Sequence, residues 1–105
     1  MLINSSLLKE HGYINGKWVG SDAKSRFDIK NAYTNEVIST LPDMGKKETD
    51  EAINAANEAW PDWRSRTAKE RAIILKKWFD LIMENQEDLA ILMTAEQGKP
   101  LAEAR

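Results

Sequence analysis

Few residues of this chain combine the type and the spacing that catalysis requires. His11 is the only histidine, and the sequence contains no cysteine. A catalytic triad needs a base, a nucleophile and an orienting acid that meet in the fold. His11 stands beside Gly12, far from any periodic segment, so we interpret it as incidental. These residues predict no catalytic site.

Two pairs of neighbouring acids, Asp50 with Glu51 and Glu87 with Asp88, could be considered for acid–base chemistry. Both pairs fall near the expected starts of helices. Carboxylates at such positions stabilise the helix dipole. We therefore favour a structural role for both pairs.

Three tryptophans, Trp60, Trp63 and Trp78, could form an aromatic box around a ligand. Their positions at a helix end and on a helix face favour the core instead, because aromatic side chains bury a large area. No segment matches the dinucleotide fingerprint or a phosphate-binding loop. The tryptophans are accordingly expected to pack inside the fold.

The charge distribution argues against nucleic-acid binding. The 15 basic and 17 acidic residues are well mixed and give a net charge of −2. A nucleic-acid interface usually needs a concentrated basic face. The nearest basic group is better interpreted as the solvated side of a helix; it comprises Lys69, Arg71, Lys76 and Lys77.

Composition also bears on location. No apolar run approaches the roughly 20 residues that cross a bilayer, and the opening segment "MLINSSLLKEHG" lacks the features of a secretory signal. The lack of cysteine leaves no disulfide framework and no thiolate zinc site. We expect a cytoplasmic protein with no membrane partner.

The elements that would position any site begin with an arm over 1–12 and two small β-hairpins over 13–41. Asn15-Gly16 lies between two short apolar segments, which predicts a type I′ turn. "RFDIK" and "EVISTL" predict a second strand pair around the turn "NAYTN". Phe27 and Ile29 alternate with polar residues, as a half-buried strand requires.

Three to four α-helices are expected over 46–105. The first ends at Pro61, because the residue before a proline resists the helical conformation. Thr67 and Glu70 form a capping box that starts the second, whose apolar residues recur at helical spacing. The third spans about 86–97, ends at Gly98 and is followed by Pro100 in the first turn of a fourth. The predicted fold class is therefore α+β.

The order of these elements, with "WRSRTAKERAIILKKWFDLI" and "EQGKPLAEA", resembles the opening of the aldehyde dehydrogenase superfamily. These two segments are similar to bacterial succinate-semialdehyde dehydrogenases of 4-aminobutyrate breakdown. The resemblance covers nearly the whole chain, although family members are several times longer. It implies that 1–105 is a truncated N-terminal segment of the cofactor-binding domain.

The resemblance implies a parent enzyme that oxidises a small aldehyde, succinate semialdehyde, with NADP or NAD and forms a homo-oligomer. In the family, a cysteine thiolate attacks the aldehyde, hydride passes to the cofactor and a glutamate activates water. This chain has no cysteine, and the family's cofactor segment lies beyond the matching region. We therefore expect no catalytic and no cofactor-binding residue here, and an inactive segment.

Some family members hold a monovalent cation near the third strand and just before "GKP". The matching positions are Ile29, Lys30 and Glu96. Backbone carbonyls can bind an ion whatever the side chain, but a lysine beside it is unfavourable. We therefore favour the interpretation of Glu96 as an ordinary solvated residue or one near a helix end.

The turn after the third strand departs from the family. There the usual pattern is Asn-Pro-(Ala/Ser)-(Thr/Asn)-Gly-Glu, while here it reads Asn31-Ala32-Tyr33-Thr34-Asn35-Glu36. The lost proline and glycine put the local shape of this turn in question.

A different class of function remains open, namely a stand-alone helical protein-interaction module without catalysis. Its helices would use their apolar faces to bind another protein. We also expect the chain by itself to expose apolar helix faces and to self-associate.

Overall fold

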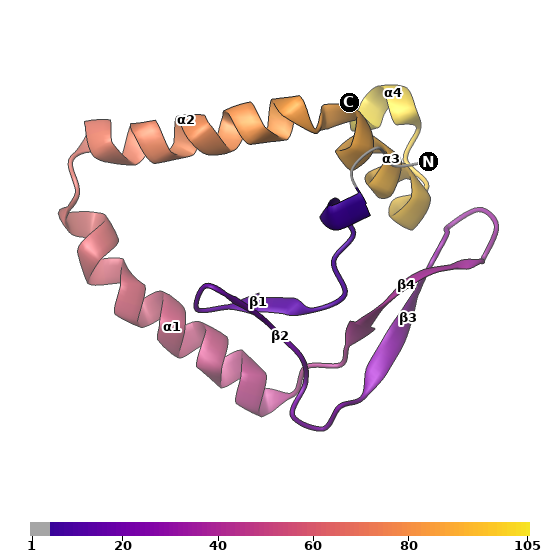
Figure 1. The fold of residues 1–105 in the computed structure, drawn as a ribbon, viewed down its shortest axis with the longest axis horizontal. Helices are drawn as coiled ribbons and strands as arrows, with labels where there is room; N and C mark the ends of the chain where they lie inside the picture. The colour runs from indigo at the N-terminus through magenta and orange to yellow at the C-terminus, as the bar shows by residue number, and fades with distance from the viewer. Residues whose placement is uncertain (1–4) are drawn as a thin grey trace.

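The structure is a computed structural model that describes residues 5–105. A short 3-10 helix, η1 (Ser5–Leu7), precedes two β-hairpins and four α-helices (Figure 1). The predicted α+β class and the order of its elements are confirmed. The part of the expected arm before Ser5 lies outside the described residues.

The first hairpin pairs β1 (Gly12–Ile14) with β2 (Lys17–Val19). Asn15 and Gly16 have φ angles of 51° and 78°, as the predicted type I′ turn requires. The rings of Tyr13 and Trp18, which are cross-strand partners, lie 5.0 Å apart. Both aromatic side chains are nevertheless largely exposed.

The second hairpin pairs β3 (Arg26–Lys30) with β4 (Val37–Pro42), with a bulge between Ile29 and Lys30. Ile29 is partly buried, but Phe27 is 48% exposed. The expectation that Phe27 points into a half-buried face was therefore wrong. The two hairpins remain separate two-stranded sheets, so no wider sheet provides a surface that covers it.

The turn between β3 and β4 keeps a defined shape despite its unusual sequence. The side-chain Oδ1 of Asn31 accepts hydrogen bonds from the amides of Tyr33 and Thr34. Asn35 adopts a φ of 64°, a left-handed conformation that asparagine tolerates better than most residues. Asn35 thus takes the place of the missing glycine, while Asn31, which the usual pattern shares, holds the turn through its side chain.

Helix α1 (Lys46–Ser65) continues through Pro61, so the expectation that it ends there was wrong. Proline lacks an amide donor and its ring crowds the carbonyl four residues before it, which here belongs to Asn57. Asn57 is exposed, where water can satisfy the carbonyl. The helix ends instead at Ser65, before the capping box of the next helix.

Helix α2 (Ala68–Glu84) begins at the predicted capping box. The amide of Glu70 donates to the hydroxyl of Thr67 over 3.1 Å, and the Glu70 carboxylate accepts from the Thr67 amide over 3.0 Å. Helix α3 (Gln86–Gln97) ends at Gly98 with a φ of 82°. A short helix, α4 (Leu101–Ala104), follows, with Pro100 at its N-cap.

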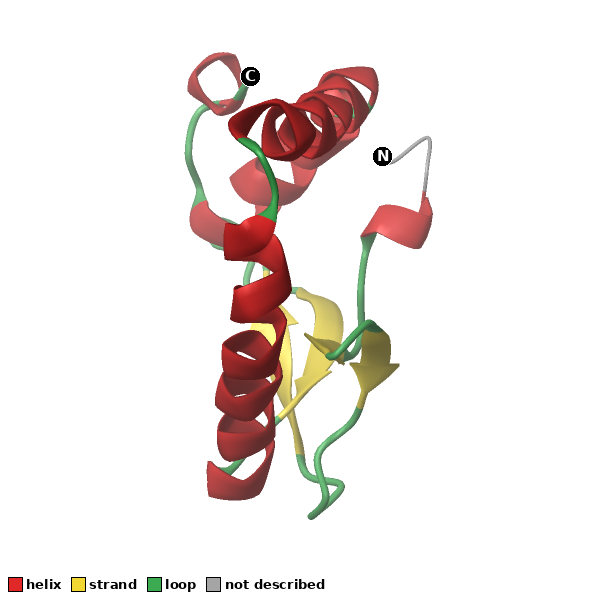
Figure 2. Cartoon of the chain, turned by 90° about the vertical axis from the view of Figure 1, so that its left-hand side faces the viewer, coloured by secondary structure: helices red, strands yellow, loops and turns green. Residues whose placement is uncertain are grey.

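These elements form an open frame. Helices α1 and α2 make two sides of it, α3 and the second hairpin lie on the other side, and the first hairpin lies inside beside α1 (Figures 1 and 2). The radius of gyration is 16.6 Å, against about 13 Å for a compact domain of 100 residues. Among the described residues, the only buried apolar ones are Pro42 and Ala90.

The exposure of the tryptophans is a consequence of this small core. Trp63 is partly buried, but Trp60 and Trp78 are 51% and 63% exposed. The expectation that they belong to the core was wrong for these two, because no other element of the described chain covers them. Within residues 5–105, no helix combines the length and apolar character needed to span a membrane.

Candidate functional site

The structure brings the end of β3 next to the end of α3, where the sequence placed a cation. The amide of Ala32 donates to the carbonyl of Ala95 over 2.9 Å and fastens the β3–β4 turn to α3. Ile29 lies partly buried before this joint, while Lys30 and Glu96 are exposed. The elements that carry the three residues therefore do meet.

The side chains there do not form a metal site by themselves. Within residues 5–105 no group of three or more histidine, cysteine, aspartate or glutamate side chains could hold a metal ion. Glu96 is one exposed carboxylate, and Lys30 adds a like charge to any cation nearby. A monovalent ion would need backbone carbonyls, so the site at Ile29, Lys30 and Glu96 stays a prediction.

A groove of about 480 Å³ lies beside the same joint. The β3–β4 turn, α3 and the segment leading to α4 form its walls, with Tyr33, Ile91 and Leu101 among its lining residues. Thr94 also lines it, and its Oγ1 is buried without a hydrogen-bond partner among the described residues. The groove offers mainly apolar contact, with Tyr33, Thr34 and Lys99 among the residues that add polar groups to its walls.

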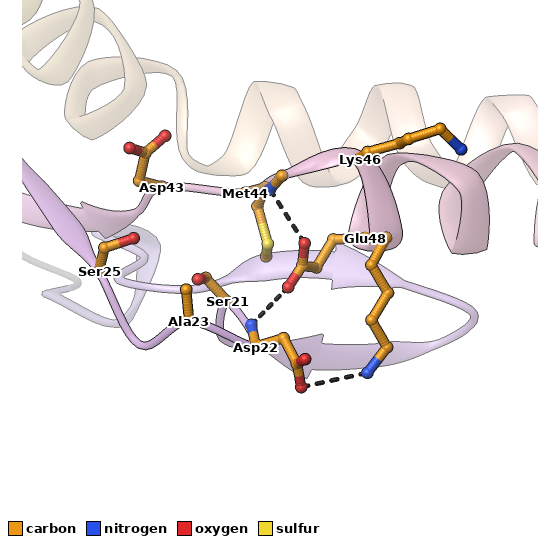
Figure 3. Close-up of a pocket in the computed structure, with 10 residues that line it drawn as sticks. Ser21, Asp22, Ala23, Ser25, Asp43, Met44, Lys46 and Glu48 are labelled. Carbon is orange, nitrogen blue, oxygen red and sulfur yellow. Dashed lines mark hydrogen bonds and ion pairs between the residues drawn. The ribbon is translucent and has the colours of Figure 1, made fainter.

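A second hollow, of about 440 Å³, lies where α1 begins beside the β2–β3 connection (Figure 3). At its centre is Glu48, which is only 6% exposed. Its carboxylate accepts hydrogen bonds from the amides of Gly45, over 2.9 Å, and of Asp22. One side chain thus caps α1 and holds the preceding connection against it.

These hydrogen bonds set the ionisation of Glu48. The amide of Asp22 lowers the pKa of Glu48 most, and the amides of Glu48 itself and of Gly45 lower it further. Donors that bind the charged form favour it. The carboxylate is therefore ionised near neutral pH with its oxygens in use, which suits a structural role and not proton transfer.

An ion pair between two residues of the chain lies on the rim of this hollow. Lys47 lies 3.1 Å from the carboxylate of Asp22, and this contact raises the pKa of Lys47. Ser21 is buried, and its hydroxyl has no hydrogen-bond partner among the described residues. The hollow is built around contacts within the chain.

The remaining candidates have structural positions. His11 is exposed directly before β1. Glu87 lies in the first turn of α3, as expected, and makes a two-pronged ion pair with Arg105. Asp50 pairs with Lys46 on α1. Sequence reasoning did not single out Glu48, although its position three residues after Gly45 matches the glutamate half of a capping box.

Comparison with known proteins identifies the class. The model of the aldehyde dehydrogenase family matches residues 18–105. A glutarate-semialdehyde dehydrogenase of Pseudomonas putida is 52% identical over 99% of this chain and 22% of its own length. The succinate-semialdehyde dehydrogenase [NADP(+)] of Escherichia coli is 50% identical over the same shares.

Solved structures agree. An NADP-dependent enzyme of Escherichia coli superposes with a TM-score of 0.95 at 50% identity, over 99% of this chain and 22% of that one. A succinate-semialdehyde dehydrogenase of Burkholderia pseudomallei gives a TM-score of 0.94. The chain belongs to the aldehyde dehydrogenase family and has the fold of that family's N-terminal part. It spans about a fifth of the length of the curated relatives it matches.

Proposed function

We propose that this chain acts as the N-terminal segment of an enzyme that oxidises succinate semialdehyde to succinate with NADP or NAD. Identity of about half to semialdehyde dehydrogenases along nearly the whole chain is the observation that carries the proposal. Breakdown of 4-aminobutyrate is the process in which such an enzyme would act. Its location would be the cytoplasm, and the enzyme would form a homo-oligomer.

The segment would contribute structure and not chemistry. It contains no cysteine to act as a thiolate nucleophile, and its one deeply buried glutamate, Glu48, is engaged as a helix cap. Within residues 5–105, no strand-to-helix turn is rich in glycine, as a turn that cradles a dinucleotide would be. The nicotinamide cofactor would supply hydride acceptance, and the residues that hold it would lie outside these 105.

The test is to express the longest reading frame that contains these residues beside the 105-residue chain alone. We expect the long product to reduce NADP or NAD with succinate semialdehyde and the short chain to be inactive. Reduction by the purified short chain would contradict the assignment of a structural role. A long product that folds but oxidises no semialdehyde would contradict the proposed reaction.

The alternative, a stand-alone interaction module, is favoured by one observation, the large exposed apolar surface of α2. It would gain support if no longer reading frame exists and if the chain is monomeric and melts cooperatively. The oligomeric state and the melting behaviour are both measured on the 105-residue chain alone.

A further inference from the structure

Helix α2 has an apolar surface that is too wide for one-sided packing. Successive residues of a helix are about 100° apart around its axis. The apolar side chains from Leu81 round to Met83 therefore form an apolar arc that spans roughly 200° around α2. An amphipathic surface helix needs an apolar arc of only about 100° or somewhat more. Each of the large side chains in the α2 arc is at least 40% exposed. They are Ile74, Leu75, Trp78, Phe79, Leu81, Ile82 and Met83.

The opposite side of α2 is mainly polar, although Ile73 lies among its charged residues and is 51% exposed. Lys76 pairs with Asp80 there, and Lys69 and Lys77 share that side and are exposed. No residue of α2 is buried. The wide apolar arc is therefore available to another polypeptide, and the polar side remains in solvent.

Arg71 lies within the apolar arc, on the same side as Trp78 and Leu75. The residue is partly buried, and its Nε is buried without a hydrogen-bond partner in the described chain. A guanidinium group cannot lose its charge in a protein. Covering the arc with a purely apolar surface would leave this charge unpaired, which is strongly unfavourable.

We propose that the arc on α2 is the docking surface for the part of the family fold beyond this segment, and that this part places a carboxylate against Arg71. The proposal rests on the proposed function. The matched relatives supply about four-fifths of their length beyond the aligned segment, which gives a partner of sufficient size. Charge complementarity with Arg71 specifies its chemistry.

The experiment uses a graft in which these residues replace the matching 104-residue stretch of the Pseudomonas putida enzyme. Arg71→Met keeps most of the side-chain volume but removes the charge, and Lys77→Met is the matched control on the polar side. We expect Arg71→Met to lower the unfolding midpoint of the graft by several degrees, because it leaves a buried carboxylate unpaired. Lys77→Met should leave the midpoint within about one degree, as exposed substitutions usually do.

A second measurement separates docking from general stability. The segment and the remaining part of the Pseudomonas putida enzyme are co-expressed as two chains and co-purified. Arg71→Met should reduce their association by at least about tenfold, since truncating one member of a buried charge pair affects dissociation strongly. Arg71→Lys should restore only part of it, because lysine lacks the planar guanidinium.

Equal behaviour of Arg71→Met and Lys77→Met in the graft would overturn the proposed carboxylate. The proposed partner would be overturned if the graft does not fold and the two chains also do not associate. A second copy of the segment would be the occupant instead if the segment alone forms a defined dimer that Arg71→Met disrupts. The reaction itself is tested separately by the long reading frame, so the two failures are distinguishable.

Discussion

At the scale of single residues, Glu48 is the group on which most local structure depends. Its carboxylate joins the start of α1 to the β2–β3 connection through the amides of Gly45 and Asp22. We expect Glu48→Gln to destabilise the graft at neutral pH, because an amide oxygen binds these donors less strongly than a charged carboxylate. Chemical denaturation at fixed pH measures the loss.

The same residue predicts a dependence on pH. The pKa of Glu48 is lowered from its ordinary value of 4.5, so the unfolded chain binds the proton more readily than the folded one. The stabilisation is complete above pH 4.5 and is lost as the pH falls through the lower pKa of the folded state. Glu48→Gln should remove this part of the acid sensitivity, whereas Glu58→Gln on the exposed side of α1 should retain it.

Residue types alone could not have revealed this role. The sequence showed acids near the starts of helices, and the expected dipole role fits Glu87. The contact between Glu48 and Asp22 joins residues 26 positions apart, and no local pattern reports such a distance. The prediction that Trp60 and Trp78 belong to the core failed for a different reason. A tryptophan side chain indicates burial, but it does not indicate which polypeptide covers it.

At the scale of elements, the capping box of α2 gives the clearest prediction. Thr67→Ala removes the hydroxyl that accepts from the Glu70 amide. We expect the graft to lose about 1 kcal/mol of stability, the usual cost of deleting such a cap. Thr67→Ser, which keeps the hydroxyl, should lose little; equal losses in the two variants would contradict the assignment.

The end of α3 gives a second prediction at the scale of elements. Gly98 has a φ of 82°, and a Cβ placed on it would lie 3.3 Å from the Cβ of Ala32. Gly98→Ala should therefore cost about 1–2 kcal/mol, the penalty for a left-handed residue with a side chain. Gly20→Ala is the control, because nothing lies within 4 Å of its added Cβ, and denaturant unfolding of both variants measures the difference.

Elements were predicted well where the signal was local. The type I′ turn, the capping box and the glycine after α3 are each fixed by residues within a few positions of one another, and all three are confirmed. Pro61 misled because a proline weakens a helix without always ending it. Whether the helix continues depends on the exposure of the carbonyl it leaves free, which sequence does not show.

At the scale of the whole molecule, the chain has elements but hardly any core. Large side chains that a compact domain would cover, such as Trp78 and Leu81, are more than half exposed. We expect the isolated chain to self-associate, since extended apolar patches promote contact between copies. Sedimentation should show dimers or larger species, and Trp78→Gln with Leu81→Gln should shift the distribution toward monomer; a clean monomer at high concentration would contradict this.

The sequence predicted this openness only through its resemblance to a longer family. Periodicity correctly placed the apolar positions of α2 on a helix, but it counts apolar residues and cannot say what lies against them. The candidate cation site shows the same limit, because Ile29, Lys30 and Glu96 belong to elements that do meet, while an ion would depend on carbonyl geometry.

The hydrogen bond between Ala32 and Ala95 has a consequence for variation within the family. A proline at position 32, as in the usual family turn, has no amide hydrogen and could not make this bond. Replacing it with alanine therefore exchanges a rigid ring for a main-chain crosslink between the second hairpin and α3. Because that crosslink uses no side-chain atoms, neighbouring positions such as Tyr33, which is 96% exposed, are free to diverge without loosening it.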